Sequence, residues 1–279
     1  MSKLRRFTYK NRKGCIEIFG SAQEVVDVAM ERENTDSNFH DYQNGYEVDE
    51  DWCGVKSYEE ALKMMRTGYQ PTVEKMKEVL KANLSGQSKR VSFRNEVVGF
   101  QPVVPLMLQG IPTCMVNTYI KPIKTKVINI CYDSTASWST SVDDMIKAGQ
   151  KMLGALIELE MQGYRFNLYA TQTYNNEKES YILCAKVKSA NTALDLKRIS
   201  FPLTHPAFFR VIGFDWYGRC PMAKYISAYG KALRYIMDND KASEMISTIM
   251  GEKVVYFSAT GILEQGKDDI KEVITNEKV

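Results

Sequence analysis

One aspartate and two hydroxyl residues stand at alternate positions in the stretch VINICYDSTASWSTS, residues 127–141. Asp133, Thr135 and Ser137 form the spacing D-x-T-x-S. A turn with this spacing presents only oxygen atoms, one carboxylate and two neutral hydroxyls. Hard divalent cations prefer such ligands and complete their octahedron with water. The spacing therefore predicts a site for Mg²⁺ or Mn²⁺ at Asp133, Thr135 and Ser137.

A structural role explains the same residues and stays open as an alternative. Serine and threonine between a strand and a helix are typical of turns and helix N-caps. Asp133 would then cap the turn, and Ser141 would cap a helix that starts near Asp143.

The elements that follow residue 125 alternate between strands and helices. Residues 127–132 are apolar and rich in β-branched side chains, as in a strand buried on both faces. A long amphipathic helix over residues 143–164 follows, and further strands and helices succeed it up to a late strand near residue 254. This order predicts a doubly wound, mainly parallel α/β sheet in which residues 127–132, 166–171 and 254–257 share one sheet, with the first of them central.

The residues before this block predict a different organisation. Residues 57–84 contain a capping box and two apolar stripes at helical spacing, which predict an N-terminal helical hairpin. Residues 85–124 contain prolines and no helical period, which predicts an extended linking segment. The expected division is an irregular segment with one short helix over residues 1–56, the hairpin and linking segment over residues 57–124, and the α/β domain over residues 125–279.

The block over residues 125–279 resembles the von Willebrand factor A-like (vWA) fold. In that family D-x-S-x-S after the first strand opens a metal-ion-dependent adhesion site (MIDAS), and Thr135 keeps the hydroxyl of the serine it replaces. The resemblance also implies a third strand that is antiparallel at the sheet edge. It further implies a later threonine and a later aspartate as ligands. Thr204 in PLTHP is the candidate threonine, and Asp215 in IGFDWYG is the candidate aspartate if FFRVIGF is the relevant strand.

The chain is also similar, over most of its length, to uncharacterised proteins of tailed bacteriophages. The stretches that carry this similarity are SYEEALKMMRTGY, GFQPVVPLMLQGIPTCM and LIELEMQGY, in that order. The resemblance implies a viral protein that works in the host cytoplasm or in the virion. It supplies no activity.

Composition excludes several classes of protein. The 37 basic and 34 acidic residues nearly balance, which argues against a dedicated nucleic-acid-binding protein. No apolar run reaches the ~18 residues that cross a membrane, and the N-terminal residues lack the apolar core of a signal peptide. The six cysteines are scattered without a CxxC pair, as in a reducing compartment. We therefore expect neither secretion nor a membrane partner.

These features predict a non-enzymatic binding protein whose partner is another protein, contacted through the vWA-like domain and its metal. The alternative is a nucleic-acid-associated protein of phage replication or packaging, which would use the basic residues 3–13, 121–126 and 186–198. A metal-dependent enzyme ranks third, because no nucleophile and base stand together. His205 has no such neighbours and is expected to be a hydrogen-bonded loop histidine.

Overall fold

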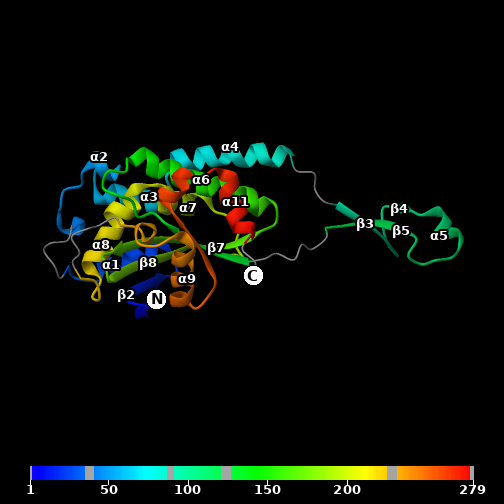
Figure 1. Ribbon diagram of the computed structural model, residues 1–279. Helices are drawn as coiled ribbons and strands as arrows, with labels where there is room; N and C mark the ends of the chain where they lie inside the picture. Colours follow the sequence, from blue (N-terminus) through cyan, green and yellow to red (C-terminus); the bar gives the residue numbers. More distant parts are fainter. Residues whose placement is uncertain (1, 35–40, 87–90, 121–126, 225–230, 277–279) are drawn as a thin grey trace. The chain divides into compact units, whose positions relative to one another are not determined.

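The computed structural model describes residues 2–34, 41–86, 91–120, 127–224 and 231–276. The chain divides into two compact units (Figure 1). Unit 1 comprises Met1–Leu80 and Lys126–Val279, and unit 2 comprises Lys81–Thr125. This division differs from the three ranges expected from the sequence, because the N-terminal residues share the sheet and the core of the C-terminal block.

Unit 1 is built on a six-stranded sheet with the order β1-β2-β8-β7-β6-β9. The strands are β1 (Lys3–Tyr9), β2 (Arg12–Phe19), β6 (Val127–Asp133), β7 (Arg165–Asn175), β8 (Glu179–Lys188) and β9 (Val254–Ser258). The β2/β8, β6/β7 and β6/β9 pairs are parallel, whereas β1/β2 and β7/β8 are antiparallel. The prediction of a mainly parallel sheet flanked by helices is confirmed.

Strand β6 lies in the interior of the sheet, between β7 and β9. Its Tyr132 is in register with Ala170 of β7 and with Phe257 of β9. The three segments expected to share one sheet do share it, which confirms that part of the prediction. The strand ends at Asp133, so this carboxylate lies at the carboxyl end of an interior strand.

The N-terminal residues form two strands where an irregular segment was expected. The β1–β2 hairpin extends the sheet beyond β8, so β8 is not an edge strand. Strand β1 has the sequence KLRRFTY, and none of its side chains is fully buried. An edge strand with so many charged residues has little apolar alternation, which is the usual sequence signal for a strand.

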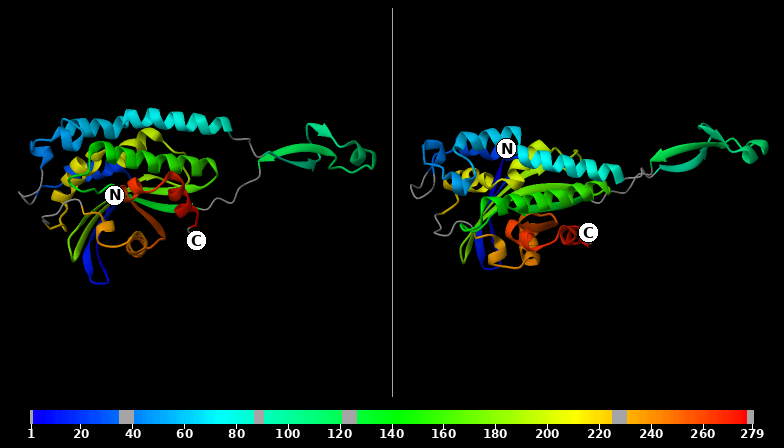
Figure 2. Two further views of the ribbon diagram at one scale, coloured as in Figure 1. Left: turned by 45° about the horizontal axis from the view of Figure 1, so that its top comes forward. Right: turned by 90° about the horizontal axis from the view of Figure 1, so that it is seen from above.

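Helices cover both faces of the sheet (Figures 1 and 2). Helix α9 packs on the face formed by Ile182, Cys184 and Tyr256, and most other helices pack on the opposite face. The α-helices of unit 1 are α1 (Ala22–Met30), α2 (Glu50–Cys53), α3 (Tyr58–Thr67), α4 (Gln70–Gly86, whose last residues belong to unit 2), α6 (Val142–Met161), α7 (Leu196–Thr204), α8 (Phe214–Arg219), α9 (Asn239–Met250), α10 (Ala259–Glu264) and α11 (Lys267–Asn276). Unit 1 also contains the 3-10 helices η1 (Tyr42–Asn44) and η3 (Leu233–Tyr235) and the π-helix η2 (Phe208–Gly213). None of the helices in the described ranges combines the length and apolarity needed to cross a bilayer.

The expected helical hairpin is present as α3 and α4. The hydroxyl of Ser57 accepts a hydrogen bond from the backbone N–H of Glu60 (3.2 Å), as its capping role requires. Gly68 ends α3 with φ of +79°, a conformation that favours glycine. Ala61 and Met65 bury their side chains against the rest of unit 1, so the hairpin needs that contact to hide its apolar face.

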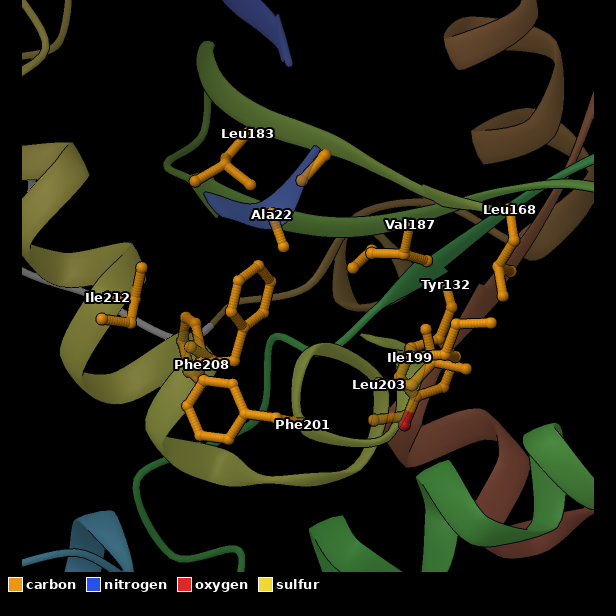
Figure 3. Packing of buried hydrophobic residues seen from close by; sticks show 14 of the residues in the cluster. Ala22, Tyr132, Leu168, Leu183, Val187, Ile199, Phe201, Leu203, Phe208 and Ile212 are labelled. Carbon is orange, nitrogen blue, oxygen red and sulfur yellow. The ribbon is translucent and has the colours of Figure 1, made fainter. Parts of the chain in front are cut away.

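The larger core gathers aromatic and aliphatic side chains from the sheet and from the segment after β8. Phe201, Phe208 and Ile212 approach Leu183 of β8 and Ala22 of α1 (Figure 3). The segment that contains them is helical, since α7 leads into η2, a π-helix over Phe208–Gly213, and then α8. The stretch FFRVIGF is therefore not a strand.

Unit 2 has its own small sheet, in the region expected to be an extended linking segment. The order of its strands is β3-β5-β4, and both pairs are antiparallel. The elements are β3 (Val91–Glu96), β4 (Gln101–Pro102), α5 (Val104–Leu108) and β5 (Met115–Ile120).

Candidate functional site

Asp133 accepts three hydrogen bonds at the end of β6. The backbone N–H of Thr135 donates to Oδ1 (3.0 Å), while the hydroxyls of Thr173 (2.7 Å) and Tyr256 (2.6 Å) donate to Oδ2. The donors come from the turn itself, from β7 and from β9. The side chain of Asp133 is fully buried, so these three donors replace the water that would otherwise hydrate the carboxylate.

The three predicted ligands have different hydrogen-bond partners. Thr135 lies beside Asp133, and its hydroxyl accepts a hydrogen bond from the backbone N–H of Thr173 (2.8 Å). Ser137 lies farther along the turn, where its hydroxyl contacts the hydroxyl of Ser139 (3.2 Å). The structure thus brings Asp133 and Thr135 together, but the hydrogen bond of the Ser137 hydroxyl is with Ser139.

Burial governs the electrostatics of this cluster. It raises the pKa of Asp133, and the hydrogen bonds from Tyr256, Thr135 and Thr173 oppose that effect. Burial, followed by the charge of Asp133, raises the pKa of Tyr256 well above its usual value. The phenol of Tyr256 therefore stays protonated and donates a hydrogen bond to the carboxylate of Asp133. A cation at Asp133 would have to share the carboxylate with these three donors.

Arg210 fixes the rest of the turn. Its guanidinium donates to the backbone carbonyls of Thr140 (2.7 Å), Ser137 (3.4 Å) and Trp52 and lies 4.6 Å from the centre of the Trp52 ring. Burial lowers the pKa of Arg210 to about 10, so it stays charged at neutral pH. Ser141 caps α6 by accepting from the backbone N–H of Asp144 (3.1 Å). The hydrogen bonds of the turn match the structural alternative.

The two later candidate ligands have other partners. Thr204 donates to the carbonyl of Ser200 (2.7 Å) and contacts the hydroxyl of Thr72 (3.1 Å). Asp215 is part of α8, where it pairs with Arg219 (3.1 Å). Asp215 was expected to follow a strand formed by FFRVIGF, but residues Phe208–Gly213 form the π-helix η2.

Thr173 and Tyr256 were missed by sequence reasoning. Each is a polar side chain within a strand that flanks β6, in the stretches RFNLYATQTY and KVVYFSA. A polar residue inside an apolar strand was the available signal, but only the hydrogen bonds of the folded chain show that both side chains reach Asp133. Among the described residues, no three His, Cys, Asp or Glu side chains form a group that could hold a metal ion.

The basic segments are distributed over different parts of the chain. Residues 3–13 form the edge hairpin β1–β2, and residues 121–126 lie outside the described residues. Residues 186–198 surround the carboxyl end of β8. The structure therefore describes two of the three segments, one in β1 and β2 and one from the end of β8 to the start of α7.

Exposed apolar side chains of the described chain are concentrated in unit 2. Seven of the thirteen exposed large hydrophobic side chains belong to it, and Leu108 is 83% and Val98 75% exposed. None of its described side chains is fully buried. We call the following residues the unit 2 apolar surface: Phe93, Val97, Val98, Phe100, Val104, Met107 and Leu108.

The sequence contains a signal for this surface that was not used. Residues 97–120 include no Asp, Glu, Lys or Arg, whereas a quarter of the whole chain is charged. An uncharged stretch of this length usually forms a core, yet here its side chains remain exposed.

Comparison with known proteins gives a family and no activity. A family model described as "Domain of unknown function (DUF7192)" matches residues 8–278. No curated protein matches the chain. No solved structure matches it either. Because the family model spans both units and all the residues of the Asp133 cluster, the chain belongs to the DUF7192 family of domains of unknown function.

Proposed function

We propose that this protein is a non-enzymatic binding protein and that a partner protein covers the unit 2 apolar surface. The observation that carries the proposal is the concentration of exposed apolar side chains in a unit with no fully buried described side chain. Contiguous apolar patches on monomers rarely exceed a few hundred Å². The seven side chains each expose more than half of their area, and the rings of Phe93 and Phe100 lie 6.4 Å apart.

The backbone of unit 2 favours a protein over a lipid surface as the partner. Strands β3 and β4 are the two edges of the small sheet, so each has one side without a neighbouring strand in unit 2. Unpaired backbone groups are costly in lipid, whereas a strand of another protein can complete the ladder. Gln101 of β4 adds a polar side chain to the same sheet, which a protein can satisfy.

The proposal also assigns a vWA-like fold to the six-stranded sheet of unit 1 and its helices. Its support is the strand order β8-β7-β6-β9, with β8 antiparallel to β7 and Asp133 at the end of β6. The β1–β2 hairpin is a departure, since it continues the sheet where that family has an edge. The resemblance to tailed-bacteriophage proteins supports a role in the infected cell or in the particle.

Two charged substitutions in unit 2 test the proposal. Met107→Glu combined with Leu108→Glu should abolish capture of the partner from infected cells, because glutamates on a covered apolar surface would be desolvated. Both side chains are exposed, so the melting temperature should not change. The measurement is quantitative mass spectrometry of proteins crosslinked to the tagged full chain.

Met30→Glu is the control, because Met30 is an exposed apolar residue of unit 1 that lies outside the Asp133 turn. It should leave the crosslinked set unchanged. If the double variant captures the same proteins as the wild type, the apolar surface is not the binding surface. Sedimentation of the wild-type chain with phosphatidylcholine/phosphatidylglycerol vesicles, lost in the double variant, would replace the protein partner with a membrane.

The metal at the Asp133 turn is a second, separate proposal. Its support is the spacing of Asp133, Thr135 and Ser137 at the carboxyl end of an interior strand, where ligands of α/β sheets gather. One carboxylate and two hydroxyls leave half of the octahedron to water or a partner, so only weak binding is expected. Calorimetric titration with Mn²⁺ should give heat at millimolar concentration. Thr135→Ser should keep that heat and Thr135→Val should lose it, because valine keeps the shape without the oxygen. Absence of heat from the wild-type chain contradicts the metal site.

A further inference from the structure

Two cysteines that are far apart in the sequence meet in the core of unit 1. Cys15 belongs to β2, and Cys220 directly follows the last residue of α8. Both are buried, and their sulfur atoms lie 3.9 Å apart. A buried free cysteine usually acts as a small apolar residue, but each of these thiols contacts another thiol. Formation of a disulfide requires the two sulfurs to approach by about 2 Å.

Polar contacts beside the two sulfurs hold α8 against β2. The indole N–H of Trp216 donates to the buried carboxylate of Glu17 (2.8 Å), and Arg32 pairs with the same carboxylate (2.7 Å). Glu17 lies two residues after Cys15, so both side chains are on one face of β2. Trp216 lies one helical turn before Cys220. The contact between Glu17 and Trp216 therefore places β2 and α8 so that the two sulfurs face each other.

The two thiols differ in acidity. A hydrogen bond from Cys15 lowers the pKa of Cys220, and the backbone N–H groups of Met222 and Ala223 add to this effect, which burial opposes. The same contact between the thiols, followed by burial, raises the pKa of Cys15. A thiolate is the reactive form of cysteine, so Cys220 is the sulfur that reacts first with an oxidant.

Cys220 also lies at the boundary of the core. Pro221, the next residue, is exposed, and Met222 and Ala223 are half-buried. A hydroperoxide is small enough to reach a sulfur in this position after a local opening of the chain. We propose that Cys15 and Cys220 form a reversible disulfide when a hydroperoxide oxidises the protein, with Cys220 as the attacking sulfur.

The reaction has two steps, and the hydroperoxide is the oxidant. The thiolate of Cys220 attacks one peroxide oxygen, so an S–O bond forms while the O–O bond breaks. The products are a sulfenic acid at Cys220 and an alkoxide or hydroxide, which takes up a proton. The sulfur of Cys15 then attacks the sulfur of the sulfenic acid. The S–S bond forms, the S–O bond breaks, and the hydroxide leaves as water with the proton of Cys15. The two thiols lose two electrons, and the peroxide gains them.

Oxidation of the full chain with hydrogen peroxide, without unfolding it, tests the proposal. Peptide mass spectrometry without reduction should detect a linked peptide that contains Cys15 and Cys220, and dithiothreitol should remove it. The bond joins residues that are 205 positions apart, so it restricts the unfolded chain strongly. The melting temperature of the oxidised chain should rise by about 5 °C or more, and dithiothreitol should reverse the rise.

Two single variants test which sulfur attacks. Cys15→Ser removes the second thiol, so peroxide should leave a sulfenic acid at Cys220, which dimedone captures. Cys220→Ser should give no dimedone adduct at Cys15, because the less acidic thiol remains. Cys114→Ser is the control, since it removes the half-exposed cysteine of unit 2 and should not change the yield of the linked peptide.

Three results would overturn the proposal. The first is a native chain that gives no peptide linking Cys15 to Cys220 under peroxide. The second is a disulfide between another pair, such as Cys131 and Cys184, in its place. The third is a dimedone adduct that forms on Cys15 and not on Cys220. None of these results bears on the unit 2 apolar surface, so this proposal and the proposed function fail independently.

Discussion

Asp133→Ala is expected to lower the free energy of unfolding by about 3–5 kcal/mol. The substitution leaves the backbone N–H of Thr135 and the hydroxyls of Thr173 and Tyr256 without their acceptor. An unsatisfied buried donor costs about 1–3 kcal/mol, and the lost carboxylate also leaves a small cavity. The two hydroxyls recover part of the loss because they can rotate toward other acceptors. Urea denaturation followed by circular dichroism measures the change.

Two further variants make this result specific. Asp133→Asn keeps the shape and one oxygen, so it should cost about 1–2 kcal/mol, less than alanine. Ser139→Ala removes an exposed hydroxyl from the same turn and should change stability by no more than about 0.5 kcal/mol. If Asp133→Ala unfolds at the same urea concentration as the wild type, the carboxylate does not hold β6, β7 and β9 together as described.

This expected cost is larger than the sequence suggests. A capping aspartate read from DSTAS alone implies about 1 kcal/mol, the scale of one turn hydrogen bond. The structure adds two donors from other strands and complete burial. The same three donors tie the turn, β7 and β9 to one carboxylate, which is why its removal is expected to cost more than the loss of a cap.

Local patterns predicted the elements whose signals are local. Ser57, Gly68 and Ser141 mark helix ends through hydrogen bonds or backbone angles within a few residues. The run of residues 127–132 predicts an interior strand because a strand that is covered on both faces needs apolar side chains at nearly every position. The position of Asp133 at the end of that strand follows from the same run.

Local sequence patterns could not predict which strands pair when they are far apart in the sequence. The parallel contact of β2 with β8 joins residues that are more than 160 positions apart. The sequence of neither strand indicates which other strand it pairs with. Thr173 and Tyr256 were missed for the same reason. The stretch FFRVIGF shows a different limit, since a short continuous apolar run is compatible with a buried strand and with a buried helix. Here the π-helix buries every one of its side chains, so periodicity could not separate the two.

Acidification should destabilise the protein through His205. Its ring lies between the rings of Tyr69 and Phe201, at centroid distances of 4.7 and 5.5 Å, and its Nδ1 accepts from the backbone N–H of Ala207 (3.2 Å). Burial lowers the pKa of His205 to about 4. The unfolded chain takes up this proton near pH 6.5, but the folded chain does so only near pH 4. Between these values the unfolded state binds more protons, so stability falls as the pH falls. The loss is about 2 kcal/mol at pH 5 and about 3 kcal/mol at pH 4 relative to pH 7.

His205→Gln isolates this contribution from that of the carboxylates, which also titrate in this range. The glutamine oxygen can accept from Ala207 but does not titrate, so the variant should lose less stability than the wild type between pH 7 and pH 4. The free energy of unfolding of each protein is measured by urea denaturation at several pH values. Between pH 7 and pH 4 the wild type should lose about 3 kcal/mol more than the variant. Parallel curves for the two proteins would mean that His205 is already protonated in the folded state or reaches water there, and its burial between Tyr69 and Phe201 would then have to be revised.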